Sequence, residues 1–203
     1  MPAPIVNRRD IEFFLYEMFD IESLTNRERY QDHDRQSFDA AINVAQTIAE
    51  KYYLPHQLKV DANEPTFDGK NVHIIPEIKA GLEAVIETGL LAPTTDYEVG
   101  GMQLPLIAAS GAFAYLSAAA STSLGYISLT HANCNLIEAH GTPEQIAKWV
   151  IPQREGRFFG TMAMTEPGAG SGLADLTTSA TKEADGTYRI RGNKIWISGG
   201  DKA

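Results

Sequence analysis

Residues 162–172 read MAMTEPGAGSG, a stretch whose residue types could hold an anionic ligand. Pro167 fixes a turn, and the three glycines at alternate positions after it let the backbone approach a ligand because they carry no Cβ. Backbone N–H groups in such a loop can point together at an anion, and Ser171 adds a hydroxyl. Taken alone, this composition favours a plain surface turn, so the remaining sequence must decide between the two.

The glycine spacing excludes two common nucleotide-binding motifs. It is G-x-G-x-G instead of G-x-G-x-x-G, and a strand-like segment follows where a dinucleotide-binding fold needs a helix. No Gly-Lys-Ser/Thr follows, so the stretch is not a phosphate-binding P-loop. A second conspicuous stretch is KIWIS at residues 194–198. Its Trp between two Ile residues is typical of a core strand, and Ser198 ends that strand before a Gly-Gly pair.

Composition narrows the function classes. The 203-residue chain has room for one large domain or one and a half ordinary ones, and its formal net charge of −9 without a basic run argues against nucleic-acid binding.

The single cysteine, Cys134, is expected to be a small buried hydrophobe, and His131 a packed helical histidine. We expect no metal site. No signal peptide or ~20-residue apolar span is visible, which favours a soluble cytoplasmic protein.

Apolar residues at helical spacing predict that the chain is helical from about residue 9 to residue 150. The first predicted helix carries one apolar stripe, made of Ile11, Phe14, Leu15, Met18 and Phe19. A longer helix spans residues 35–53, and Pro55 ends it. The apolar side of this second helix is Phe38, Ile42, Ala45, Ile48, Ala49 and Tyr52.

Turn formers and caps divide the rest of the helical region. Residues 56–74 look like a loop with turn formers at Asp68 and Gly69, and the third helix, PEIKAGLEAVIET, is capped by Gly89. The apolar stretch over residues 105–139 is either two buried helices or one long helix broken near 120–122. The sequence TPEQ that begins at Thr142 forms a capping box with proline at the first helical position.

After residue 152 the pattern changes to β-branched and aromatic runs of strand length. The candidate strands are FFGTMAMT (158–165), DLTTSATKE (175–183) and TYRIRGNKIWIS (187–198), and ADGT between the last two carries a hairpin signal. Helices followed by strands predict an α+β fold. Because so small a sheet is rarely stable, we expect an unfinished β domain and the N-terminal part of a longer polypeptide. The alternative is a naturally short protein that docks its sheet on the helices.

Two motifs in combination closely resemble those of the acyl-CoA dehydrogenase family. In that family one strand carries Thr-Glu-Pro-x-Ala-Gly-Ser-Asp and a later strand carries Lys-x-Trp-Ile-Thr/Ser; here they read MAMTEPGAGSG and GNKIWISGG. The stretches ETGLLAPTTDYEVGGMQLP and HGTPEQIAKWVIPQREGRFFG also follow the family's order. The N-terminal APIVNRRDIEFFLYEMFDIESL resembles the leading helix of a longer-chain subgroup that includes broad-range acyl-CoA and 3-methylmercaptopropionyl-CoA dehydrogenases.

The resemblance implies an N-terminal all-α helical domain followed by the start of a β-barrel-like middle domain, with the family's C-terminal helical domain absent from this chain. We accordingly divide the chain into an extension helix at residues 1–34, the N-terminal helical domain at 35–154 and an incomplete middle domain at 155–203.

The activity that the resemblance implies is FAD-dependent α,β-dehydrogenation of a saturated acyl-CoA to the trans-2-enoyl-CoA. A glutamate takes the α-proton and the flavin takes the β-hydride; electrons then pass to electron-transfer flavoprotein. That glutamate belongs to the C-terminal domain, so this chain is expected to contain no catalytic base and to be inactive alone. Glu166 is expected to belong to the flavin-side turn instead. Family members are homodimers or homotetramers.

The resemblance also places flavin contacts on both motifs. The strand at 162–165 lies along the flavin ring, Trp196 lies beside the ring, and the Ser198 hydroxyl donates near the flavin N5. The implied FAD-binding residues are Met162, Ala163, Met164, Thr165, Gly170, Ser171, Trp196, Ile197 and Ser198.

The substrate side is less fully determined. The resemblance places Ser171 near the acyl-CoA and the helix at 125–135 beside the acyl tail. One departure is Gly172, which stands where the family has Asp, so a carboxylate that would brace the turn is missing. Two alternatives stay open: an acyl-CoA oxidase that passes electrons to oxygen, and a non-catalytic binding or assembly protein on the same fold.

Overall fold

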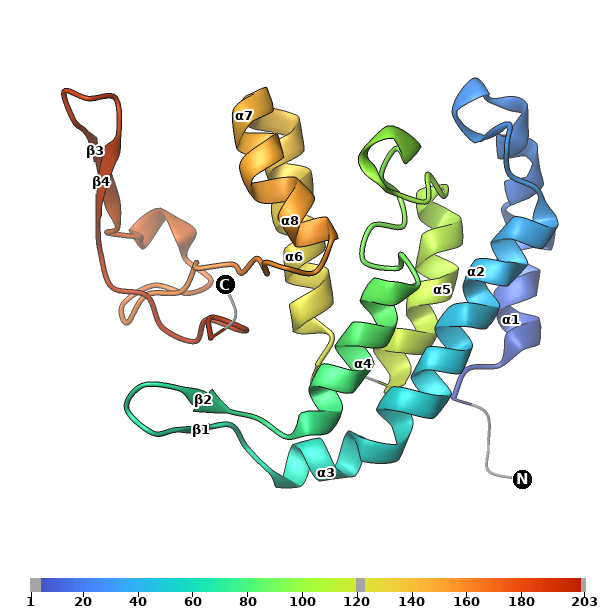
Figure 1. The fold of residues 1–203 in the computed structure, drawn as a ribbon, viewed down its shortest axis with the longest axis horizontal. Coiled ribbons are helices and arrows are strands. Elements are labelled where there is room, and N and C mark those ends of the chain that lie inside the picture. Colours follow the sequence, from blue (N-terminus) through green and yellow to red (C-terminus); the bar gives the residue numbers. More distant parts are fainter. Residues whose placement is uncertain (1–4, 120–122, 202–203) are drawn as a thin grey trace.

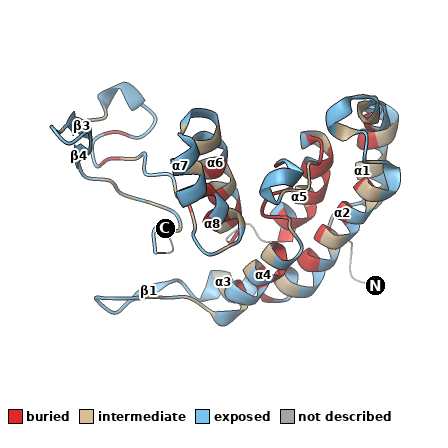
Figure 2. Ribbon diagram, turned by 45° about the horizontal axis from the view of Figure 1, so that its top comes forward, coloured by how far each residue is buried: buried red, intermediate tan, exposed pale blue. Residues whose placement is uncertain are grey.

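Three helices form the main packed layer of the protein: α2 (Arg35–Ile48), α4 (Pro76–Glu87) and α5 (Leu106–Ala119). The computed structural model describes residues 5–119 and 123–201. The three helices lie side by side (Figure 1), and buried residues are concentrated on the helices of the molecule (Figure 2). Apolar burial of this kind is the main favourable term in folding. Fully buried core residues include Phe38, Ile42, Val85, Ala112, Tyr115 and Leu116.

The start of α2 is fixed by a capping box. The Asp34 carboxylate accepts the Ser37 backbone N–H at 2.7 Å, and the Ser37 hydroxyl receives the Asp34 N–H at 2.9 Å. The predicted apolar side of this helix is buried except at Tyr52, which is half-buried. The prediction of a loop directly after Pro55 was wrong, because α3 (Gln57–Ala62) follows. Pro55 lies in the first turn of a short 3-10 helix, where its missing N–H is not needed.

The N-terminal helix differs from its predicted stripe. It begins as α1 (Arg8–Glu12) and continues as a π-helix over Phe13–Met18, before the 3-10 turns Ile21–Asn26 and Glu28–Tyr30. Within the stripe only Leu15 is fully buried, and Ile11 is half-buried. The reason is that π-helical turns are wider, so residues spaced for 3.6 per turn no longer share one face. The exposed members are Phe14, Met18 and Phe19.

The predicted loop at 56–74 contains a small hairpin as well as α3. Strands β1 (Thr66–Phe67) and β2 (Val72–His73) pair in antiparallel fashion across a turn at Asp68 and Gly69. Gly69 has a φ of +96°, and the Asp68 carboxylate accepts two backbone N–H groups of the turn at 2.7 and 2.8 Å. These two turn formers were therefore predicted correctly. Gly89, with φ of +77°, caps α4 as predicted.

A second helical unit follows α5. Helix α6 (Gly125–His140) packs against α8 (Ile151–Arg154) and the segment before it, which is α7 (Pro143–Gln145) followed by a π-helix over Ile146–Val150. Two separate helices thus occupy residues 105–139, and the break predicted near 120–122 lies outside the described residues. The capping box at Thr142 is confirmed. Cys134 is buried as predicted, and burial raises the pKa of its thiol, whereas burial lowers the pKa of the half-buried His131.

The C-terminal part contains less regular structure than its composition predicts. Strands β3 (Ser179–Lys182) and β4 (Tyr188–Arg191) form the predicted hairpin across Asp185 and Gly186. The strand prediction was wrong at 158–165 and 192–198, which are irregular because, within the described residues, a single backbone hydrogen bond joins them, too few for a ladder. The α+β class is confirmed. The hairpin is exposed along both strands and stands away from the helices (Figure 1), so it is not docked on them. Among the described residues, no helix is long and apolar enough to cross a membrane.

Candidate functional site

The two sequence motifs lie next to each other in the structure. The Ile195 N–H donates to the Thr165 carbonyl at 3.0 Å, and the Thr161 hydroxyl donates to the Ser198 carbonyl. The stretch at 161–165 therefore runs antiparallel to the stretch at 195–198. The two motifs, which the whole β3–β4 hairpin separates along the chain, therefore lie side by side, and the candidate flavin-binding residues 162–165 and 196–198 belong to these paired stretches.

Glu166 connects the two motifs at the turn formed by residues 165–169, which we call the corner. Its side chain is only 4% exposed. It accepts the Thr177 N–H at 2.8 Å, the Thr177 hydroxyl at 2.7 Å, the Thr178 N–H at 2.9 Å and the Lys194 ammonium at 2.9 Å. Its own backbone closes the turn by exchanging two hydrogen bonds with Ala169. A buried carboxylate needs such partners, and here they come from distant parts of the chain.

These donors fix the charge of Glu166. Hydrogen bonds from Thr178, from the Thr177 backbone and from Lys194 hold the pKa of the Glu166 carboxyl far below its usual range. A carboxylate that is so strongly stabilised in its charged form is poorly suited to accept a proton. The sequence pattern places Glu166 in a turn but does not reveal these partners, since Thr177, Thr178 and Lys194 are distant along the chain.

The lowered pKa of Glu166 predicts a pH dependence. Because the folded-state pKa lies below the ordinary value, the Glu166 contacts stabilise the fold fully above about pH 4.3 and lose their effect as the pH falls toward the folded-state pKa. We expect wild type to exceed Glu166→Gln in free energy of unfolding at pH 7, and this difference to shrink by about pH 3.5. Urea titrations at both pH values measure it. A difference that stays constant or grows at low pH would contradict this account of the turn.

The surface beside this corner combines exposed apolar side chains with unpaired amides. Trp196 is 86% exposed, and Met162 and Met164 are also exposed. Among the described residues, the backbone N–H groups of residues 162–165 have no hydrogen-bond acceptor. Trp196 has a φ of +58°, a left-handed conformation that is rare for a bulky residue and often marks a functional site.

An acidic side chain that the sequence analysis did not predict lies beside the glycine turn. Gly170 and Ser171 are exposed, as a ligand-binding turn requires. A Cβ on Gly172 would lie 2.9 Å from the Asp175 carboxylate, so this acidic group lies beside the turn although residue 172 itself has no side chain. Asp175 follows three positions later in a 3-10 turn, Leu173–Asp175. The carboxylate expected to be lost at Gly172 is therefore present nearby on a different residue.

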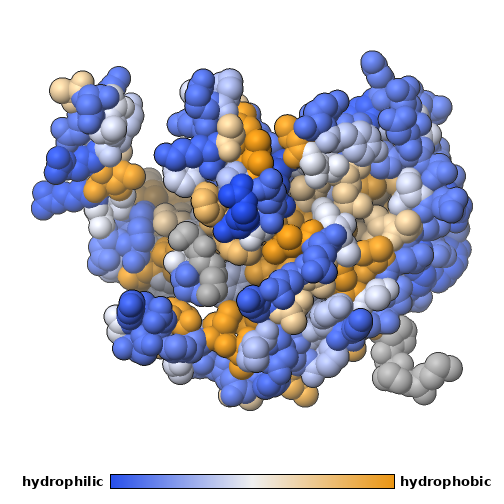
Figure 3. Space-filling model, viewed as in Figure 1, coloured by the Kyte–Doolittle hydropathy of each residue, from blue (hydrophilic) through white to orange (hydrophobic). Residues whose placement is uncertain are grey.

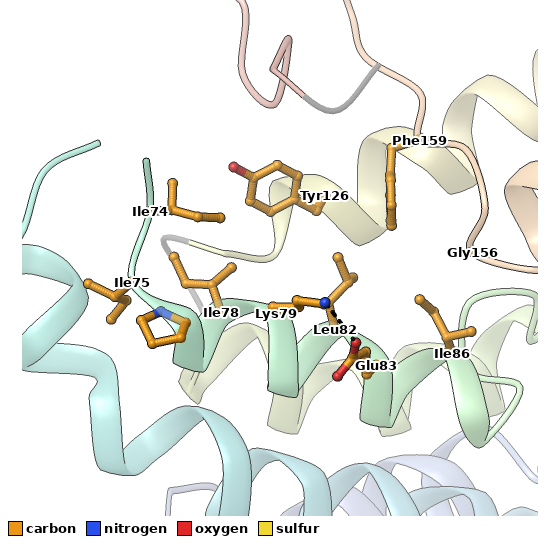
Figure 4. Close-up of a pocket in the computed structure, with 11 residues that line it drawn as sticks. Ile74, Ile75, Ile78, Lys79, Leu82, Glu83, Ile86, Tyr126, Gly156 and Phe159 are labelled. Atoms are coloured by element: carbon orange, nitrogen blue, oxygen red, sulfur yellow. Dashed lines mark ion pairs between the residues drawn. The ribbon is translucent and has the colours of Figure 1, made fainter. Parts of the chain in front are cut away.

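An apolar groove of about 440 Å³ lies between α4 and the residues that follow α8. Figure 4 shows Ile78, Leu82 and Ile86 of α4 on one side, with Tyr126 and Phe159 opposite. Hydrophobic side chains also gather near the centre of the face of the molecule that Figure 3 shows. The hydroxyl of Tyr126, which lines the groove, donates to Asp201 at 3.3 Å, and Asp201 directly follows the second motif. No group of three potential metal ligands occurs in the described part of the chain.

The fold is that of solved acyl-CoA dehydrogenases. The chain superposes on butyryl-CoA dehydrogenase of Megasphaera elsdenii with a TM-score of 0.70 at 23% identity, covering 84% of this chain and 43% of that one. An acyl-CoA dehydrogenase of Geobacillus kaustophilus gives a TM-score of 0.65 at 28% identity, covering 82% and 40%. The family's sequence model for the acyl-CoA dehydrogenase N-terminal domain matches residues 37–157, and that for the middle domain matches residues 161–203. The chain belongs to the acyl-CoA dehydrogenase family.

Curated relatives of similar sequence are longer than this chain. A butyryl-CoA dehydrogenase of Syntrophomonas wolfei is 29% identical over 95% of this chain and 32% of its own length. A 3-methylmercaptopropionyl-CoA dehydrogenase of Ruegeria pomeroyi is 27% identical over 98% of this chain and 33% of its own length. The chain thus spans about a third of the length of these relatives. Solved neighbours of the same fold include an acyl-CoA dehydrogenase of Bacillus anthracis complexed with FAD, with a TM-score of 0.65 at 23% identity, covering 82% of this chain and 27% of that one.

Proposed function

We propose that this chain forms the flavin-binding and part of the acyl-CoA-binding surface of an FAD-dependent acyl-CoA dehydrogenase. The observation that carries the proposal is the row of amides at 162–165, unpaired within the described residues, beside the exposed Trp196 and Met164. The FAD complex of the Bacillus anthracis acyl-CoA dehydrogenase supports the choice of cofactor.

The chemistry of this surface fits a flavin. An isoalloxazine ring has apolar faces and a pyrimidine edge rich in hydrogen-bond acceptors, so it needs flat apolar contacts on one part and N–H donors on another. The amides of residues 162–165 supply donors, and Trp196 and Met164 supply the apolar contacts. When bound, FAD would accept the hydride removed from the substrate's β-carbon.

The candidate residues of the two motifs divide the contacts with the flavin between them. The amides of 162–165 and the hydroxyls of Thr165 and Ser198 bind the polar edge of the ring and disperse negative charge that develops there. Trp196 covers the ring and excludes water from it. Gly170 and Ser171 form the turn beside the pyrophosphate and the acyl-CoA.

The substrate and partners belong to the same proposal. We assign a saturated acyl-CoA as substrate, electron-transfer flavoprotein as electron acceptor and a homodimer or homotetramer as the assembly. We place the acyl tail along the helix at 125–135, whose Tyr126 borders the apolar groove. The α-proton acceptor is assigned to a helical domain of the family that the two matched domains do not include.

Binding and anaerobic reduction of FAD test the proposal. We expect the protein to bind FAD, and the flavin absorbance of the complete enzyme to bleach when a saturated acyl-CoA is added. Trp196→Ala should weaken FAD binding about tenfold, the equivalent of one lost aromatic contact. Tyr188 is also an exposed aromatic residue but lies on β4, away from the two motifs, so Tyr188→Ala should leave FAD binding unchanged.

The alternative functions give different results in the same experiment. A flavin that bleaches and is then reoxidised rapidly when oxygen is admitted identifies an oxidase. Absence of FAD binding in wild type contradicts the proposal and favours a non-catalytic binding or assembly protein. Equal affinities in wild type and Trp196→Ala would remove Trp196 from the flavin site.

A further inference from the structure

We propose that the ion pair between Glu166 and Lys194 positions Trp196 for contact with the flavin, so that Lys194 is a positioning residue of the site. This inference rests on the proposed function and adds a residue to it. Lys194 is not among the residues that the family motifs place at the flavin.

Lys194, in the second motif, contacts two residues of the first motif, one on each side of Thr165. Its ammonium donates to the Met164 carbonyl at 2.8 Å and to the Glu166 carboxylate at 2.9 Å. These two acceptors flank Thr165, whose carbonyl receives the next backbone N–H of the second motif, that of Ile195. The Lys194 side chain is 21% exposed and that of Glu166 is 4% exposed, so water competes only weakly for the pair.

The conformation of Trp196 requires an external cause. A left-handed φ of +58° is unfavourable for a large side chain and persists only where the surroundings enforce it. Packing of the indole does not enforce it, because the side chain is 86% exposed. The backbone on both sides of Trp196 is tied instead: Ile195 binds Thr165, and the Ser198 carbonyl binds Thr161.

The Lys194 side chain connects the backbone hydrogen bond of Ile195 to a further segment of the chain, through Glu166. In the part of the chain that the structure describes, the Ile195 bond is the single backbone–backbone hydrogen bond between the two irregular stretches, so no neighbouring ladder bond supports it. Through Glu166, Lys194 connects this link to the two threonines Thr177 and Thr178 that precede β3. The pair therefore sets the register between the two stretches, and through that register the direction in which Trp196 points.

Amide hydrogen exchange and FAD titration of the whole protein test the inference. Lys194→Met should raise the exchange rate of the Ile195 amide at least about tenfold while amides of α2 keep their wild-type rates. The same variant should raise the Kd for FAD about tenfold. Lys194→Arg keeps the charge, so both the Ile195 exchange rate and the Kd for FAD should stay close to their wild-type values. Lys182→Met, a matched loss of an exposed lysine on β3, should change neither.

The outcomes separate this inference from the proposed function. If wild type binds no FAD but Lys194→Met still frees the Ile195 amide, the flavin role of the pair is overturned together with the proposed function. If wild type binds FAD and Lys194→Met binds it equally well, the positioning role is overturned and the proposed function stands. Glu166→Gln preserves the shape of the corner without its charge and should reproduce the Lys194→Met exchange result. Unchanged Ile195 exchange in both variants would also overturn the inference.

Discussion

Replacing Gly156 with alanine is expected to destabilise the protein by about 2–5 kcal/mol. Gly156 has a φ of +71°, which strains any residue with a Cβ. A Cβ there would also lie 2.4 Å from Cδ1 and 2.7 Å from Cγ1 of Ile86 on α4. Gly156 lies two residues after the end of α8, so the substitution would push α4 away from the stretch that leads to the candidate flavin surface. Chemical denaturation measures the loss.

Gly186 provides the matched control for Gly156. It has a φ of +85°, but apart from its two chain neighbours no described residue has an atom within 4 Å of the position that its Cβ would take. Gly186→Ala should therefore lose only about 1–2 kcal/mol, the cost of the backbone conformation alone. Ile86→Ala in the Gly156→Ala background should remove the overlap, leaving the cost of the lost isoleucine and of the backbone. Equal losses for the two glycine substitutions would show that crowding against Ile86 has no effect.

Removing Glu138 is expected to destabilise the protein by about 3 kcal/mol, because it leaves the charge of Arg154 without its partner. The Arg154 guanidinium donates to the Glu138 carboxylate between α8 and α6. The Arg154 side chain is 5% exposed and that of Glu138 is 29% exposed, so the arginine has little access to water. Glu138→Leu removes the partner while keeping apolar bulk, and urea denaturation measures the loss.

The double variant tests whether an isolated charge causes that loss. Glu138→Leu/Arg154→Leu removes both charges and should regain most of the stability, since apolar residues often replace a buried ion pair with little loss. Lys79 and Glu83 offer the matched control, because their ion pair on α4 is exposed and its removal should change stability by less than about 1 kcal/mol. A double variant as unstable as the single one would mean that packing, and not charge, is responsible.

Local rules in the sequence predicted the features that depend on neighbouring residues. The capping box at Thr142, the αL glycine at Gly89 and the hairpin turn at Gly186 each depend on residues a few positions apart. The family resemblance added one long-range expectation, that the two motifs share a surface, and the hydrogen bond from Ile195 to Thr165 joins them there.

Features that depend on distant partners were not predicted. The π-helix at Phe13–Met18 left three of the five stripe residues exposed, although their spacing is helical. The strand at 158–165 was predicted from propensity, but strands form only where a ladder of partners exists. The contacts of Glu166 could not be read from its neighbours, because its donors lie 11, 12 and 28 residues away. The family carries its Asp at the position of Gly172. Asp175 was not predicted to replace it because it lies three positions further along the chain.

The amides at 162–165, which have no acceptor in the described ranges, have a consequence for the behaviour of the protein in solution. A run of free N–H groups beside exposed Met and Trp side chains offers a template on which a further extended segment could add. When nothing covers this edge, a second molecule can pair with it, so association should increase with concentration and favour aggregation. A ligand that occupies the amides would then act as a solubilising cap, which gives the same surface a protective role in addition to binding.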